Sequence, residues 1–198
     1  MNLPNRLTIA RLIMVPLFVA LMTVDHYYAY AVAFVVFLTA SITDYLDGKI
    51  ARERNLITNF GKLMDPLADK VLVAAAFVML IGVPALSIPP WTIVAILARE
   101  FLVTGARSMA VTQDTVIAAN MWGKTKAVIQ MVYINVFLFL TAAVMAIQQY
   151  SPDQSDFYSG LVRTASTWTI IFVALFTVYS GIQFARSNWQ SLRLGAQQ

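Results

Sequence analysis

Long apolar stretches alternate with short polar or turn-rich segments along this chain of 198 residues. Each apolar stretch is near the length of about 20 residues that a helix needs to cross a bilayer. The pattern therefore predicts six membrane-spanning helices, at residues 7–24, 28–47, 67–87, 90–111, 125–147 and 164–185. We expect an all-α integral membrane protein with a short N-terminal juxtamembrane segment.

The segments between these stretches are too short to hold a soluble domain. They cover residues 24–27, 48–61, 82–90, 113–124 and 148–163. No internal repeat or low-complexity tract divides the chain, so residues 1–198 are predicted to form a single membrane domain. Hydrophobic residues make up 59% of the chain and charged residues 12%. The mean hydropathy of +0.69 excludes an ordinary soluble domain of this size.

Positive charges are distributed unevenly across the predicted membrane domain. If the N-terminus lies inside, thirteen of the 14 Lys and Arg residues fall in the inner half or in inner loops, and only Arg163 lies outside. This asymmetry predicts that both termini face the cytoplasm. No basic stripe with interleaved aromatic residues is present, so nucleic-acid binding is not expected. The absence of cysteine excludes disulfides and thiolate metal ligands.

Four aspartates lie at the inner ends of the predicted second and third helices. Asp44 and Asp47 are three residues apart and Asp65 and Asp69 are four apart, so each pair occupies one face of a helix. Four neighbouring carboxylates beside hydrocarbon repel one another unless protons or cations relieve them. Because oxygen ligands favour a hard ion, these aspartates predict a magnesium site, with manganese as a substitute.

The basic residues around the aspartates allow a simpler interpretation. Lys49, Arg52, Lys62 and Lys70 could neutralise the carboxylates as solvated ion pairs. Three small residues favour a ligand site instead, because they leave room for a ligand beside the aspartates. These residues are Gly48, Ala51 and Gly61.

The acidic segment resembles the complete signature of a known family, the CDP-alcohol phosphotransferases. The signature reads Asp44-x-x-Asp47-Gly48-x-x-Ala51-Arg52, then eight residues, then Gly61-x-x-x-Asp65-x-x-x-Asp69. The layout of six membrane helices is similar to that family too, so the resemblance covers most of the chain. It implies that a phosphatidyl or similar phosphoryl group passes from a CDP-linked donor to an alcohol, with release of CMP.

The resemblance also implies roles for individual residues and a homodimer. All four aspartates would bind two divalent ions that hold the donor diphosphate, and Asp69 would also take the proton from the acceptor hydroxyl. The CDP moiety would lie against residues of the signature and of the N-terminal segment, namely Asn5, Thr8, Asp44, Gly48, Ala51, Arg52 and Gly61. The N-terminal residues could equally begin an interfacial helix with a turn.

The predicted fourth helix carries charge deep in the membrane. Arg99 lies nine residues after Pro90, about 13 Å along a helix, where an unpaired charge costs about 2.5 to 3.5 kcal/mol. We expect the adjacent Glu100 to point in another direction and not to serve Arg99. Snorkelling of the outermost cations to lipid headgroups is one interpretation. The other is a cluster beside the metals that binds the phosphate of an acceptor through Arg99, Arg107, Lys124 and Lys126.

The sequence around these cations resembles one bacterial branch of the family. Residues 98–107 and 123–126, with Gln130, are similar to the branch that transfers a phosphatidyl group from CDP-diacylglycerol to sn-glycerol 3-phosphate and makes phosphatidylglycerophosphate. Ala127-Val128 departs from the Thr-Ala or Thr-Thr of many members of this branch. The resemblance implies phospholipid biosynthesis at the bacterial cytoplasmic membrane, with the active site on the cytoplasmic side.

Other functions stay open at this point. Inositol phosphate, phosphatidylglycerol or serine could be the acceptor in the same chemistry, although serine would leave the cations without a phosphate to bind. A divalent-metal transporter is the alternative from another class. The acidic residues disfavour it, because they cluster on one side of the membrane with no second set on the outer half.

Overall fold

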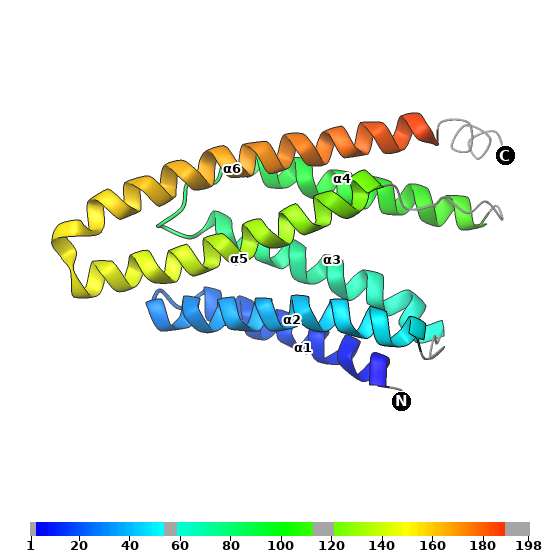
Figure 1. The fold of residues 1–198 in the computed structure, drawn as a ribbon, viewed down its shortest axis with the longest axis horizontal. Coiled ribbons are helices and arrows are strands. Elements are labelled where there is room, and N and C mark those ends of the chain that lie inside the picture. Colours follow the sequence, from blue (N-terminus) through cyan, green and yellow to red (C-terminus); the bar gives the residue numbers. More distant parts are fainter. Residues whose placement is uncertain (1–2, 54–58, 113–120, 189–198) are drawn as a thin grey trace. The chain divides into compact units, whose positions relative to one another are not determined.

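The computed structural model describes residues 3–53, 59–112 and 121–188, and Figure 1 shows its fold. This described part contains six α-helices and no strand. The helices are α1 (Leu3–Met22), α2 (Tyr27–Glu53), α3 (Asn59–Ile81), α4 (Pro90–Thr112), α5 (Met121–Tyr150) and α6 (Pro152–Ser187). The prediction of an all-α protein with six helices is confirmed.

Two of the described helices, α5 and α6, are long and apolar enough to cross a membrane. They contain 30 and 36 residues, more than the roughly 20 that a crossing needs. The apolar parts of α1 and α2 are shorter, at Leu7–Met22 and Tyr27–Thr43. These features agree with a membrane protein, while six separate spans stay a prediction.

Fewer residues separate the second and third helices than the hydropathy pattern predicts. α2 continues past Gly48 to Glu53 and α3 begins at Asn59, so much of the predicted break at 48–61 is helical. Good helix formers such as Lys, Ala and Arg follow Gly48, and a single glycine costs only about 1 kcal/mol in a helix. Both aspartate pairs therefore lie within helices and not at their ends.

Two other helix boundaries differ from the prediction. α6 begins at Pro152 and includes the polar segment up to Arg163. Proline suits the first position of a helix, where no N–H is needed, and Asp153 in the first turn complements the helix dipole. At the other end of the chain, α1 begins at Leu3. The described residues before the first predicted span therefore form the first turn of α1, and a juxtamembrane position for them stays a prediction.

Contacts divide the chain into two units, Met1–Ser87 with Ile134–Ser166, and Ile88–Tyr133 with Thr167–Gln198. In the first unit, α1 packs against both α2 and α3. The rings of Phe18 in α1 and Phe37 in α2 are fully buried, with their centroids 5.8 Å apart. This packing places α1 beside both helices that carry the predicted metal ligands.

Two polar contacts hold the first part of α6 against the segment that follows α3. Arg163 Nη2 donates a hydrogen bond to the carbonyl oxygen of Pro84 at 2.7 Å. The backbone N–H of Ser87 donates to Ser166 Oγ at 3.1 Å. Ser166 is fully buried, so its hydroxyl supplies an acceptor that water could not easily provide. These contacts fix the end of the α3 region without using the signature residues.

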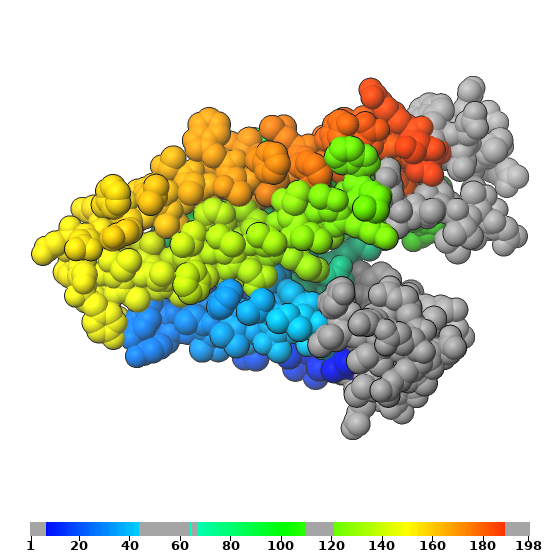
Figure 2. Space-filling model, viewed as in Figure 1, coloured from blue at the N-terminus to red at the C-terminus, as the bar shows by residue number. Residues whose placement is uncertain are grey.

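The second unit contains α4, the first part of α5 and the last part of α6. Its fully buried apolar side chains include Ile93, Ile96 and Ile170. Trp122 of α5 packs against the ring of Tyr179 of α6, with centroids 5.3 Å apart. Large side chains such as Phe172 and Leu175 remain exposed on α6, which Figure 2 shows in orange and red. An exposed apolar surface of this kind suits a helix that meets lipid.

Candidate active site

The predicted metal ligands lie on two helices that both pack against α1. Asp44 and Asp47 belong to α2, and Asp65 and Asp69 belong to α3. Asp69 is half-buried. The side chains of the other three aspartates are not among those described, and Figure 2 draws these three residues in grey.

A metal site is not visible in the described part of the chain. No group of three or more His, Cys, Asp or Glu side chains that could hold an ion occurs among the described residues. Because three of the four predicted ligands lie elsewhere, the two-ion site stays a prediction. Most of the predicted CDP contacts also fall outside the described side chains, namely Asn5, Asp44, Gly48, Ala51, Arg52 and Gly61.

Two buried polar residues of α1 accompany the aspartate helices. Thr8 is completely buried, and Arg11 is only 1% exposed. They are three residues apart, so they lie on the same side of α1. Thr8 is one of the predicted CDP contacts, whereas the sequence identifies Arg11 only as an inner cation. An arginine buried this deeply requires polar or acidic neighbours, and the two helices packed on α1 carry all four aspartates.

Arg99 of α4 lies in the second unit and is only 8% exposed. Its Nη2 donates a hydrogen bond to Ser180 Oγ of α6 at 2.8 Å. Its Nη1 lies 3.7 Å from Glu100 Oε1. The expectation that these adjacent residues cannot serve each other is therefore wrong. Their Cβ atoms point in different directions, but both side chains are long enough to curve toward one another.

Glu100 connects α4 to α5. Its carboxylate accepts a charge-assisted hydrogen bond from Lys126 Nζ. Gln130 Nε2 lies 3.5 Å from the same carboxylate oxygen and also donates to Thr177 Oγ1 of α6 at 3.2 Å. Lys126, Gln130 and Thr177 are all buried. Polar side chains from three helices thus form one network inside the second unit. We call it the Glu100 network, and its members are Arg99, Glu100, Lys126, Gln130 and Thr177.

Counted over the described side chains, the Glu100 network carries a net charge of one positive unit. Arg99 and Lys126 contribute two positive charges and Glu100 contributes one negative charge. Arg99 Nε is buried and has no hydrogen-bond partner among the described residues. Burying an uncompensated cation between apolar helices is unfavourable. An anionic ligand that accepts a hydrogen bond from Arg99 would relieve that cost.

The other two predicted acceptor cations lie outside this network. The Cζ atom of Arg107 is 5.2 Å from the ring centroid of Phe184 in α6, which is a cation–π contact. Its Nε is buried and likewise lacks a hydrogen-bond partner within the described ranges. Lys124 is exposed at the start of α5. The structure therefore brings Arg99 and Lys126 together at Glu100, places Arg107 against α6, and leaves Lys124 at the surface.

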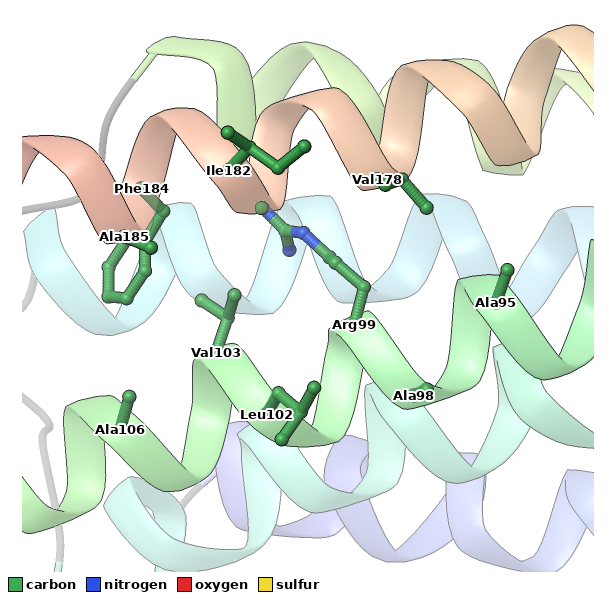
Figure 3. A pocket seen from close by; sticks show the side chains of 11 residues that line it. Ala95, Ala98, Arg99, Leu102, Val103, Ala106, Val178, Ile182, Phe184 and Ala185 are labelled. Carbon is green, nitrogen blue, oxygen red and sulfur yellow. The ribbon is translucent and has the colours of Figure 1, made fainter.

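A cavity of about 500 Å³ lies between α4 and α6 in the second unit, and Figure 3 shows the side chains that line it. Small residues such as Ala95, Ala98 and Ala106 form part of its wall, and Arg99 is the charged residue in its lining. The stem of Arg99 crosses α6 at Gly181. A Cβ atom at that position would lie 2.9 Å from Arg99 Cγ, so the close approach requires glycine.

The family model described as CDP-alcohol phosphatidyltransferase matches residues 1–179, which is most of the chain. The chain belongs to the CDP-alcohol phosphatidyltransferase family. The resemblance inferred from the aspartate signature is thereby confirmed. The matched residues include both aspartate pairs and the cations of α4 and α5, whereas Ser180 and Gly181 lie just beyond them.

Curated relatives in this family carry a more specific name. The chain is 34% identical to the CDP-diacylglycerol-glycerol-3-phosphate 3-phosphatidyltransferase of Bacillus subtilis, over 97% of each chain. It is also 34% identical to the Rickettsia typhi protein of the same name, over 90% of this chain and 94% of the relative. A probable phosphatidylglycerophosphate synthase of Mycobacterium tuberculosis is 43% identical over 69% of this chain and 66% of the relative.

Reasoning from the sequence of this CDP-alcohol phosphatidyltransferase misses the part of α6 that meets Arg99. Thr177, Ser180 and Gly181 form this surface, and none of them is a predicted site residue. A signal for them is nevertheless present. Two polar residues three apart in an otherwise apolar run tend to face a polar partner on a neighbouring helix.

Proposed function

We propose that this protein transfers the phosphatidyl group from CDP-diacylglycerol to sn-glycerol 3-phosphate. The 1-hydroxyl oxygen of the acceptor forms a new bond to the lipid-side phosphorus of the donor, and the bond from that phosphorus to the oxygen of CMP breaks. The products are phosphatidylglycerophosphate and CMP. The names of relatives that match nearly the whole chain support this reaction.

The observation that carries the choice of acceptor is the surplus positive charge of the Glu100 network. Arg99 is nine-tenths buried and keeps an Nε donor without a partner among the described residues. A phosphate-bearing acceptor would supply both the negative charge and the hydrogen-bond acceptor. Arg107 and Lys124 add positive charge on α4 and α5. Free serine carries no phosphate and is a zwitterion, so it would bring no net negative charge to this cluster.

Asp44, Asp47, Asp65 and Asp69 would hold two magnesium ions. The donor set fits this metal, since it consists of carboxylate oxygens on consecutive helices that share α1 as a neighbour. When bound, the ions would offset negative charge on the phosphoryl oxygens. Manganese would suit the same oxygen ligands.

The protein's own residues would perform the remaining tasks. The half-buried carboxylate of Asp69 would accept the proton of the acceptor hydroxyl. Arg52 would pair with the donor diphosphate, and the small residues of the signature would let cytidine approach the backbone. Thr8 lies buried on α1, beside the helices that carry this signature.

The charge distribution supports an orientation for this enzyme. With both termini in the cytoplasm, the aspartates and nearly all cations lie on the inner side of a bacterial cytoplasmic membrane. Glycerol 3-phosphate is water-soluble, so an inner-side active site would receive it from the cytoplasm. We further propose a homodimer, which chemical cross-linking in native membranes would test.

The deciding experiment is an assay of the purified protein with CDP-diacylglycerol and a panel of acceptors. We expect CMP release with sn-glycerol 3-phosphate and little with inositol phosphate, phosphatidylglycerol or serine. Each lipid product should be identified by mass. Release of CMP with another acceptor in preference to glycerol 3-phosphate would overturn the proposed acceptor but not the family chemistry.

A further inference from the structure

Glu100 is an acidic side chain in a place where the proposed reaction needs positive charge. Its side chain is 14% exposed and sits between Arg99 of its own helix and Lys126 of α5. Both cations approach the same carboxylate oxygen, Oε1. A carboxylate beside a phosphate-binding cluster weakens binding through repulsion unless it has another task. The contacts of Glu100 indicate what that task is.

The two cations at Glu100 have different bonding. Lys126 Nζ makes the close charge-assisted hydrogen bond to the carboxylate. Arg99 is held mainly by Ser180 and lies 3.7 Å from the carboxylate, beyond hydrogen-bond length. Arg99 also keeps its Nε–H without a partner within the described part, as does Arg107 two turns along α4. The open donors therefore belong to the arginines of α4, while Lys126 is engaged by Glu100.

We propose that Arg99 is the residue that binds the acceptor phosphate, while Lys126 is the counterion of Glu100. Lys126 then affects acceptor binding only by neutralising the carboxylate of Glu100. Glu100 is then a positioning residue that holds the guanidinium of Arg99 from one side while Ser180 holds it from the other. Lys126 neutralises Glu100, so that the carboxylate does not cancel the charge of Arg99. This assignment rests on the proposed function and changes the role predicted for Lys126.

The charge balance distinguishes this assignment from direct contact between Lys126 and phosphate. Arg99, Glu100 and Lys126 together carry one positive charge in the wild type. Lys126→Met leaves no net charge, and the freed carboxylate turns to Arg99. Glu100→Gln leaves two positive charges without the carboxylate between them. The double variant Glu100→Gln with Lys126→Met restores a single positive charge on Arg99.

The test compares the KM for sn-glycerol 3-phosphate in these variants at saturating CDP-diacylglycerol. We expect Lys126→Met to raise that KM by roughly thirtyfold or more, the effect of unpairing a buried charge. Glu100→Gln should raise it by about tenfold. The double variant should return to within about fivefold of the wild type. The KM for CDP-diacylglycerol should stay nearly constant throughout, which would place the effect at the acceptor and not at the donor. Val128→Met, at an exposed position on α5, is the matched control.

Two outcomes would overturn the assignment. A double variant no better than Lys126→Met alone would mean that Lys126 itself contacts the phosphate. Unchanged acceptor KM in Lys126→Met would mean that the Glu100 network has no part in acceptor binding.

A second measurement separates this assignment from the proposed reaction. The thermal unfolding midpoint of each purified variant is recorded with and without inorganic phosphate, and without donor. Phosphate should raise the midpoint of the wild type and of the double variant but not that of Lys126→Met. If the wild type shows this shift but releases no CMP with glycerol 3-phosphate, the proposed reaction fails and the assignment stands. If phosphate shifts no midpoint, the assignment fails even where CMP release is normal.

Discussion

Gly181→Ala is the substitution that tests the geometry of Arg99 most directly. The added methyl carbon would lie 2.9 Å from Arg99 Cγ, 3.5 Å from Nε and 3.8 Å from Cδ. The first distance is shorter than carbon–carbon contacts in packed proteins. The side chain has little freedom to move aside, because Ser180 holds its far end at 2.8 Å and the residue is only 8% exposed. Arg99 must therefore leave its position.

The expected magnitude combines three effects. Forcing a methyl group into a packed site costs about 1 to 3 kcal/mol, and replacing glycine by alanine in a helix regains about 1 kcal/mol. The unfolding free energy should thus fall by no more than about 2 kcal/mol. A displaced guanidinium would also lose its hydrogen bond to the acceptor phosphate. A hydrogen bond between charged groups is worth about 1.5 to 3 kcal/mol. We therefore expect the KM for sn-glycerol 3-phosphate to rise by roughly tenfold to a hundredfold.

The assay is CMP release from CDP-diacylglycerol as a function of acceptor concentration, with thermal unfolding of the same preparations. Gly160→Ala is the matched control, because it lies in the same helix and has no atom within 4 Å of the added carbon. It should leave the kinetics unchanged and raise stability slightly. If both alanine variants have the same acceptor KM, the position of Arg99 does not matter to acceptor binding, and the reasoning from the close approach is wrong.

Three further predictions follow from other parts of the chain. Asp65→Asn and Asp69→Asn should each abolish CMP release in detergent, and wild-type turnover in Asp69→Asn would contradict its role as the base. Chelation of divalent ions with EDTA should stop CMP release and added magnesium should restore it, whereas continued turnover in EDTA would exclude the two-ion site. Ser166→Ala should lower stability by about 1 to 3 kcal/mol, because the backbone N–H of Ser87 loses its acceptor. The exposed Thr164→Ala is the control for it, and equal thermal midpoints for the two would show that this contact is unimportant.

The helical architecture could be predicted from the sequence because a bilayer imposes one constraint on every spanning segment. Apolar runs of the right length had to be helices, since backbone groups find no water in hydrocarbon. That constraint ends where the chain leaves the membrane. Residues 152–163 and 48–53 are polar yet helical, because proline at a first helical position, acidic side chains in a first turn and good helix formers favour a helix without an apolar run.

Some features of the site could likewise be predicted from the sequence, and others could not. The aspartate signature was sufficient to identify the family, because its residues and their spacing along the chain resemble the family's signature without any knowledge of which helices are neighbours. The pairing of Lys126 with Glu100, and of Arg99 with Ser180, depends on which helices are neighbours. The spacing of residues along one helix contains no such information. The error about Arg99 and Glu100 has a related cause, since helix geometry fixes the direction of Cβ but not the path of a long, flexible side chain.

The length of α6 has a practical consequence. At 36 residues the helix extends about 54 Å, well beyond a hydrocarbon layer of about 30 Å. If α6 crosses a membrane as proposed, its polar first turns would extend beyond the hydrocarbon as a stiff helical rod. Such a rod should withstand limited digestion by proteases, and it offers a firm handle for an antibody fragment in electron cryomicroscopy of a protein otherwise too small to align.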